Sequence, residues 1–405
     1  MTTTTWAPPA RGRARPSEWA RENLLRTPAD AVLTVVAGGV LLWLVAGAAR
    51  WVLFQAEWEI VRRNLTLFVV GRFPRDQVWR PAVAMVVVGA MAGVGLGATA
   101  GGRGSALLAR ATLARAVRRA WPVLAMVAVL LALVETVTPL LVAATAVAVL
   151  AAGQAVGSRL PARPARWAAR GALLAPVAAY LVIAGFGGVG WERWGGGLLN
   201  LALATGGIAL SFPFGVLLAL GRRSSLPALR WVCVGYIELI RGVPLIALLF
   251  MGSFMLGFFL PEGLRPTEVT RAMIAIVLFT AAYVAEIVRG GLQSVPRGQH
   301  EAATALGLSP LRVTALVVLP QALRNVIPAT VGQFISLFKD TSLVFIIGLT
   351  DLLAVADLVR SQPDFLAQGL ERETLGFAAF LFWVGAYTMS RESQLLERRL
   401  GVGQR

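Results

Sequence analysis

At positions 301–320 the chain reads EAATALGLSPLRVTALVVLP. Its alanine-rich start predicts a short helix with the acidic Glu301 near the N-terminus, where a carboxylate complements the helix dipole. Gly307 predicts a flexible turn, and Pro320 predicts the end or a kink of a second helix. The polar segment 290–325 is far longer than a simple connection needs. We expect it to protrude and to offer leucines to a partner's groove, namely Leu306, Leu308 and Leu311.

The chain around this segment is strongly apolar. Of its 405 residues, 57% are apolar and 15% are charged, whereas an ordinary soluble domain has about 25% charged residues. The apolar residues gather in runs long enough to cross a bilayer. The sequence therefore predicts an all-α, polytopic transmembrane fold with ten spans, at about 31–54, 81–101, 121–137, 138–156, 171–190, 197–220, 231–258, 269–289, 327–349 and 374–392. If the third and fourth runs form a re-entrant hairpin, the number falls to eight.

The net charge of +17 comes almost entirely from arginine, since Lys339 is the single lysine. The arginines fall mainly in short gaps between apolar runs, where they orient the spans and meet anionic lipid headgroups. We therefore set nucleic-acid binding aside and expect membrane lipid as a partner. An even number of spans places both termini on the same side, which we expect to be the cytoplasm, and the arginine-rich gaps at 103–119 and 159–170 agree. The loop at 51–80 disagrees, because it is arginine-rich and yet expected outside.

Several kinds of chemistry are excluded by composition. Cys233 is the single cysteine and His300 the single histidine, so neither a disulfide within the chain nor a histidine-based metal cluster or catalytic triad can form. A phosphate-binding Gly-Lys-Ser/Thr loop is absent, because Lys339 follows Phe338. We expect no enzyme activity, no cofactor in this chain, and a plain packing role for Cys233.

The spacing within the opening segment is itself a motif. Glu-Ala-Ala is followed after three residues by Gly307, and after nine more by an aliphatic residue, one residue and Leu-Pro. This pattern resembles the EAA loop of ABC importer permeases, with Val317 in place of the common isoleucine. The resemblance implies that a separate ATPase engages this loop. The residues expected to couple to it are Glu301, Ala302, Ala303, Gly307, Leu308 and Pro320.

Neighbouring motifs narrow the resemblance. The stretches IELIRGVPL (237–245), AYVAEIVRG (282–290), PRGQ (296–299) and FKDTSL (338–343) are similar to polar and basic amino-acid permeases of the histidine/glutamine type. This similarity extends over about 194–391. The stretch NLTLFVVGR (64–72) resembles a permease of general L-amino-acid importers. We therefore expect a cytoplasmic tail with accessory spans over 1–190 and a five-span permease domain over 191–405.

The family resemblance implies a multi-subunit machine. This chain would be the permease subunit that moves L-amino acids across the bacterial inner membrane. Its expected partners are an ATP-binding subunit dimer that holds ATP-Mg, a second homologous permease and a periplasmic amino-acid-binding protein. The alternative is a stand-alone secondary transporter or channel for amino acids, but that function leaves the long coupling segment unexplained.

Two charged pairs lie at the inner ends of spans. Glu238 and Arg241 are three residues apart on one predicted helix and can pair, and Gly242 and Pro244 then break that helix. Glu286 and Arg289 lie directly before the coupling segment. We expect gating or structural roles for these four charges, with pairing of Glu286 and Arg241 across helices as one possibility.

The charged residues Lys339 and Asp340 are predicted near the middle of the ninth span. Opposite charges there are costly, and neighbouring helical positions point about 100° apart, so they share a face only if the helix is interrupted. Thr341 and Ser342 supply hydroxyls for freed backbone groups. We hypothesise that these four residues line the translocation path and meet the amino acid's charged groups; a buried structural salt bridge is the equal alternative.

Overall fold

A computed structural model of the chain describes residues 23–100, 126, 129, 137–261, 263, 265–366 and 368–400. Over these residues the elements are helices, and the only β-pairing is an isolated bridge between Gly196 and Asp351. The predicted all-α class is thereby confirmed. The chain divides into two compact units, Met1–Glu57 and Trp58–Arg405.

The first unit contains one long helix. This helix, α2 (Pro28–Arg50), continues into the π-helical turn η1 (Trp51–Gln55). Thr27 and Asp30 form a capping box, with Pro28 at the first helical position, so its start is specified locally. Together α2 and η1 are long and apolar enough to cross a membrane.

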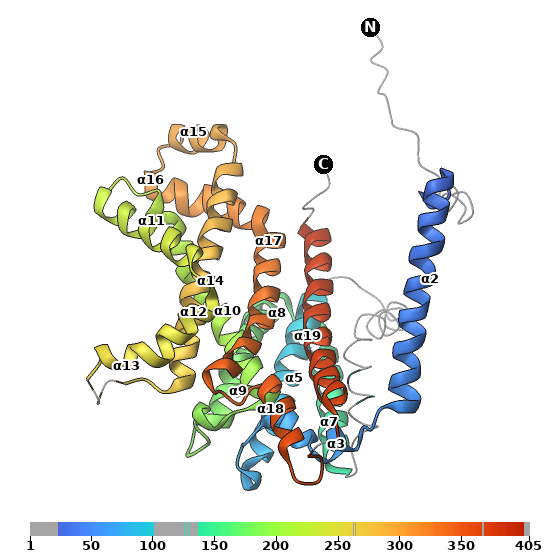
Figure 1. Cartoon of the computed structure of the whole chain (residues 1–405). Helices are drawn as coiled ribbons and strands as arrows, with labels where there is room; N and C mark the ends of the chain where they lie inside the picture. Colours follow the sequence, from blue (N-terminus) through green and yellow to red (C-terminus); the bar gives the residue numbers. More distant parts are fainter. Residues whose placement is uncertain are drawn as a thin grey trace. The chain divides into compact units, whose positions relative to one another are not determined.

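The second unit begins with short helices and then an apolar helical layer (Figure 1). Its first elements are α3 (Glu59–Arg63), α4 (Leu65–Val70), η2 (Arg75–Gln77), α5 (Trp79–Ala100), α7 (Val137–Ser158), α8 (Ala162–Gly171), η3 (Ala172–Leu174), α9 (Ala175–Ala184) and η4 (Trp191–Arg193). The next are α10 (Gly196–Arg222), α11 (Pro227–Gly242), α12 (Leu245–Phe250), η5 (Met251–Met255), α13 (Leu256–Phe259) and α14 (Glu268–Ser294). The last are α15 (Arg297–Ala305), α16 (Pro310–Arg312), η7 (Val313–Val318), α17 (Leu319–Asp340), η8 (Thr341–Ile347), α18 (Leu352–Leu358), η9 (Val359–Ser361) and α19 (Glu371–Leu400).

Six helical segments in the described part of the chain are long and apolar enough to cross a membrane: Pro28–Gln55, Arg75–Thr99, Ala162–Ala184, Gly196–Arg222, Glu268–Ser294 and Pro310–Ile347. Each overlaps one predicted span. The predicted span at 138–156 corresponds to α7, and that at 374–392 lies within α19, which is long enough but less apolar. The predicted span at 121–137 falls almost wholly outside the described residues.

The predicted span at 231–258 is broken. Helix α11 and the segment Leu245–Met255 meet at an angle of 105°. The break follows Gly242. Pro244 has no backbone N–H to donate, so it interrupts the series of backbone hydrogen bonds along the helix. This agrees with the break predicted from the glycine and the proline.

The ninth span differs from the prediction in its start. It was expected to begin near Val326, after a helix ended or kinked by Pro320; instead, a continuous helical path covers Pro310–Ile347. Pro320 lies in the first turn of α17. Because the π-helical turn η7 directly precedes α17, Pro320 marks a change of helix type within a continuous helical path.

Helices α5 and α7 pack with their backbones in close contact. A Cβ atom at Gly93 or Gly97 would overlap carbonyl oxygens of α7, and one at Gly157 would overlap the Val94 carbonyl oxygen. These glycines recur every four residues, and small residues at this spacing let membrane helices approach each other closely. The accessory spans therefore have a specific packing contact that their apolar composition did not reveal.

The short helices α3 and α4 pack against the C-terminal helices α18 and α19. The rings of Phe68 and Phe377 meet edge to face with their centroids 5.0 Å apart. The side-chain amides of Asn64 and Gln362 exchange hydrogen bonds of 3.1 and 2.8 Å. Gly71, at φ 63°, lies so close to Gly195 that a Cβ would overlap its backbone. The segment that resembles general amino-acid permeases is thus part of the same packed unit, while the domain boundary near residue 190 remains a prediction.

Candidate functional site

The predicted coupling segment forms a short helix at one end of the second unit. Figure 1 shows α15 lying crosswise where α14 ends and α16 begins, with α18 at the opposite end. The side chain of Gln321 donates to Gln299 Oε1 of α15 at 3.2 Å, and that of Asn325 donates to Ser294 Oγ at 3.0 Å. The coupling helix is therefore tied to the start of α17, and α17 to the end of α14.

The helix α15 buries one side and exposes the other. Ala303 is 4% exposed and packs in a cluster with residues of α14 and α17, whereas Glu301 and Ala302 are exposed. In the turn that follows, Leu306 is 82% and Leu311 78% exposed. These two leucines are available to a partner as expected. The third predicted leucine, Leu308, is partly buried against the same cluster.

Gly307 closes α15 in the left-handed region, at φ 78°. The N–H of Gly307 donates to Thr304 O at 2.9 Å, and that of Leu308 donates to Ala303 O at 3.3 Å. A glycine adopts this conformation without the steric cost that a Cβ imposes. The predicted turn is thus present, and its geometry explains why glycine suits the position.

A cluster of charges joins the ends of α10, α11 and α14 near the coupling helix. Glu286 is its centre, since its carboxylate lies 3.2 Å from Arg222, 3.7 Å from Arg241 and 2.9 Å from Nε of Arg289. Glu238 lies 3.1 Å from Arg222. The expected pairing of Glu286 with Arg241 across helices is therefore confirmed.

One predicted pair is wrong. Glu238 was expected to pair with Arg241 on the same helix, but it pairs with Arg222 of α10, while Arg241 points to Glu286 and stacks over Tyr283 at 5.7 Å. Spacing within a helix permits such a pair but does not exclude better partners on a neighbouring helix. Arg222 was missed because its sequence position, at the inner end of a span, is typical of arginines that only contact lipid.

The four residues predicted to line the path lie on both sides of a change from α-helix to 3-10 helix. Helix α17 ends at Asp340, and Thr341 begins the 3-10 helix η8. Lys339 is exposed, Asp340 is half-buried, and no ion pair between them is present among the described residues. The hydroxyl of Ser342 donates to Lys339 O at 2.8 Å. The helical path continues through this point but changes from α-helix to 3-10 helix, and the role of these residues in the translocation path stays a prediction.

Thr341 faces inward and belongs to a buried network that the sequence did not reveal. It is 0% exposed, and its Oγ1 donates to Phe338 O at 2.7 Å and accepts from Asn200 Nδ2 at 3.1 Å. The same amide donates to Asp351 Oδ2 at 3.2 Å, and Asn200 Oδ1 accepts from the N–H of Leu352 at 2.9 Å. Thr341 is thus a structural link between helices, which leaves Lys339, Asp340 and Ser342 nearer the surface.

Asp351 caps α18 in this network. Its Oδ1 accepts from the N–H of Ala354 at 2.9 Å, and the residue is 0% exposed. Burial raises the pKa of the Asp351 carboxyl, although the hydrogen bonds from Ala354 and Asn200 act in the opposite direction. Two features of the sequence could have indicated this network. They are a lone asparagine within an apolar run and an aspartate directly before a leucine-rich helix.

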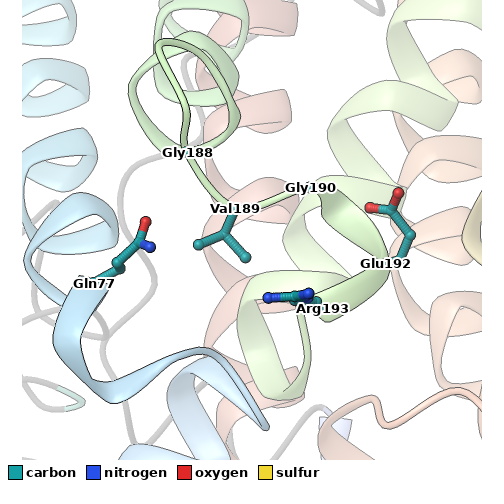
Figure 2. A pocket seen from close by; sticks show the side chains of 6 residues that line it. All are labelled: Gln77, Gly188, Val189, Gly190, Glu192 and Arg193. Atoms are coloured by element: carbon teal, nitrogen blue, oxygen red, sulfur yellow. The ribbon is translucent and has the colours of Figure 1, made fainter.

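A pocket of about 460 Å³ is lined by none of these residues (Figure 2). It is lined by Gln77, Gly188, Val189, Gly190, Glu192 and Arg193. None of these residues was predicted as functional. Among the described residues, no group of three or more histidine, cysteine, aspartate or glutamate side chains is placed to hold a metal ion.

Taken together, a bundle of apolar helices, a broken span and a protruding coupling helix define a membrane permease. Residues 211–402 match the family of binding-protein-dependent transport system inner membrane components. Over 98% of this chain and 96% of the relative, it is 34% identical to the inner membrane amino-acid ABC transporter permease protein YhdY of Escherichia coli. The chain belongs to the family of amino-acid ABC transporter permeases.

Two further relatives match different shares of this chain. The glutamate/glutamine/aspartate/asparagine transport system permease protein BztC of Rhodobacter capsulatus is 36% identical over 95% of this chain and 93% of its own length. The glutamate/aspartate import permease protein GltK of Escherichia coli is 34% identical, but it matches 50% of this chain and 90% of its own length. The additional length is therefore shared with some members of the family and absent from others.

Proposed function

We propose that this chain moves L-amino acids across the bacterial inner membrane and draws its energy from a separate ATPase that grips α15. The observation that carries the proposal is the geometry of that helix and of the segment after it: α15 is buried at Ala303, whereas Leu306 at its end and Leu311 of α16 are exposed. Exposed leucines beside a short helix fit a hydrophobic groove. In this arrangement ATP-Mg is held by the partner, and this chain binds no cofactor.

A push on α15 has a direct route to the rest of the molecule. The bonds from Gln321 to Gln299 and from Asn325 to Ser294 connect α15, α14 and α17. Helix α14 carries Glu286, whose three arginine partners lie on α10, α11 and α14 itself. Helix α17 ends at Asp340. Rotation of α14 therefore changes the charge cluster, and rotation of α17 changes the surroundings of Asp340. An importer requires a two-state shift of this kind.

The path for the solute is proposed to pass Lys339, Asp340 and Ser342. An amino acid carries a carboxylate and an ammonium group, and the ammonium of Lys339 and the carboxylate of Asp340 are the complementary charges. The change from α-helix to 3-10 helix at this point alters the directions in which successive side chains point. Thr341 supports these residues from behind, through its bonds to Asn200 and Phe338.

The relatives suggest the remaining partners and the solute. Membership of binding-protein-dependent systems supports a solute-binding protein outside the membrane, together with a second homologous permease and two ATPase subunits. The names of BztC and GltK favour glutamate, aspartate and their amides as solutes. We place both termini of the chain in the cytoplasm, on the side of α15.

The coupling proposal is tested with the leucines of the coupling turn. The chain would be expressed with its candidate ATPase, and co-purification and amino-acid-stimulated ATP hydrolysis would be measured for the double variant Leu306→Ala, Leu311→Ala. We expect a loss of both, because two anchor side chains are removed and each contributes about 1 to 2 kcal/mol. Leu210→Ala, at a 55% exposed leucine in the middle of α10, is the matched control. Normal ATPase binding by the double variant, or energised uptake by the chain without any ATPase, would contradict the proposal.

A further inference from the structure

The pocket in Figure 2 is formed by residues shortly before α10 and by Gln77 of η2. Its residues Glu192 and Arg193 lie on η4, shortly before α10, a helix of 27 residues whose last residue, Arg222, belongs to the Glu286 cluster. At 1.5 Å per residue the pocket is therefore about 40 Å from that cluster. If α15 faces the cytoplasm, the pocket faces outward.

The walls of the pocket are held in place by the protein itself. Val189 is 4% exposed; its N–H donates to Ile183 O at 2.9 Å, and its carbonyl accepts from the Trp194 indole at 2.9 Å. The guanidinium of Arg80 donates to the carbonyls of Val182 and Gly185 at 3.1 and 3.0 Å. The backbone of the loop that forms one wall is thus fixed before any ligand arrives, whereas the exposed side chains of Glu192 and Arg193 become ordered on binding.

The polar groups of the pocket are not satisfied by each other. Glu192 and Arg193 are consecutive on η4, and neither takes part in an ion pair with any described residue. Gln77 comes from η2, and its Oε1 is buried without a hydrogen-bond partner in the described structure. Figure 2 shows its side chain extending toward Val189. The site therefore offers one anion, one cation and one amide.

We infer that this pocket binds a free, zwitterionic α-amino acid. The ammonium group meets the Glu192 carboxylate and the carboxylate meets the Arg193 guanidinium, with Gln77 lining the site beside them. A simple anion would leave Glu192 unpaired and a simple cation would leave Arg193 unpaired, so a molecule with both charges fits best. The volume of about 460 Å³ is in the range of small-molecule sites, with room for the side chain.

This site is separate from the proposed path at Lys339, Asp340 and Ser342. It would hold the solute at the outer end of α10 before it enters the path. That role rests on the proposed function, which supplies the reason for an amino acid to be present, whereas the ligand class follows from the charges in the pocket.

Direct binding tests the inference. The full chain, assembled with its ATPase partner in lipid nanodiscs and without a binding protein, would be titrated with radiolabelled L-glutamine, L-glutamate, L-asparagine, L-aspartate, L-histidine and L-arginine. We expect at least one to bind, and Glu192→Gln and Arg193→Gln each to weaken it by about tenfold or more, since each removes a charge-assisted contact. N-acetyl-L-glutamine, which lacks the ammonium group, should bind weakly to every variant.

Matched controls lie beside the pocket. Asp76→Asn and Arg72→Gln remove exposed charges near Gln77 that do not line the pocket, and they should leave the dissociation constant within about twofold of the original. Asp340→Asn is measured in parallel, because binding that this variant abolishes belongs to the translocation path. Thermal unfolding of each variant shows whether it is folded.

The inference is overturned if none of the six amino acids binds, if the pocket variants bind like the original, or if Asp340→Asn alone abolishes binding. Uptake in a deletion strain separates this failure from that of the proposed function. Uptake restored by the original chain, together with unaltered binding by Glu192→Gln and Arg193→Gln, refutes only the pocket. Uptake that does not depend on the chain refutes the proposed function itself.

Discussion

The two ends of α10 hold polar side chains in opposite ways. At its last residue, Arg222 meets Glu238 and Glu286 in a cluster whose side chains remain 23 to 55% exposed. Near its start, Asn200 bonds to Asp351 and Thr341, and all three are at most 2% exposed. Exposed charges exchange partners at little cost, whereas separating buried groups leaves them unsatisfied. We conclude that the contacts at the start of α10 are rigid and that the contacts at its coupling end can rearrange.

The largest effect on stability is expected from removing the buried hydrogen bonds at the start of α10. Asn200→Leu keeps the approximate volume but removes the partner of Asp351, Thr341 and the N–H of Leu352. The N–H of Leu352 then lacks its partner, and Asp351 and Thr341 each lose one of their hydrogen bonds, so the free energy of unfolding should fall by about 3 kcal/mol. Denaturant unfolding in detergent measures the change. Thr205→Ala, at an exposed threonine of the same helix, should have little effect. A stable Asn200→Leu protein would contradict the comparison.

A smaller loss of stability is expected at the coupling end. Glu286→Gln leaves Arg222, Arg241 and Arg289 with Glu238 as the remaining carboxylate. Because the cluster is partly exposed, the cost is about 1 to 2 kcal/mol, and the main change should be in ATP hydrolysis without uptake. Uptake and hydrolysis would be measured together. Glu268→Gln on the same helix is the control, and equal behaviour of both variants would remove the special role of the cluster.

The coupling turn should respond to a single methyl group. Gly307→Ala places a Cβ at φ 78°, which costs about 1 to 2 kcal/mol and loosens the end of α15. We expect weaker ATPase binding in a co-purification assay. Gly298→Ala, within α15 and with open space around its Cα, is the matched control. If both variants bind alike, the left-handed turn is not needed for coupling.

The smallest effect concerns pH. The pKa of Asp351 is raised in the folded protein by burial, so the folded state binds more protons than the unfolded state just above the ordinary value of 3.8. The unfolding free energy should therefore fall as pH rises from that value toward the folded pKa. Asp351→Asn should flatten this part of the profile, and Asp357→Asn, at an exposed carboxylate of the same helix, should not. An unchanged profile for Asp351→Asn would show that its carboxyl does not titrate there.

Local features of the site were well predicted, and contacts between helices were not. The turn at Gly307, the break after Gly242 and the exposure of Leu306 depend on neighbouring residues, so spacing and residue type were enough. The pair of Glu238 with Arg222 was missed because it depends on how α11 is rotated against α10. The start of the ninth span was misplaced because a proline at a change of helix type looks the same in sequence as one that ends a helix.

By itself, the sequence determined the all-α membrane fold, most of the spans and the coupling motif, because hydrophobic run length and short-range spacing express them directly. The tertiary structure decided the rest. Asn200 meets Asp351 across 151 positions, and Asn64 meets Gln362 across 298. The pocket likewise joins Gln77 to Glu192 and Arg193. Such contacts follow from the rotation and register of packed helices, and no periodicity along a single helix encodes which distant side chains will meet.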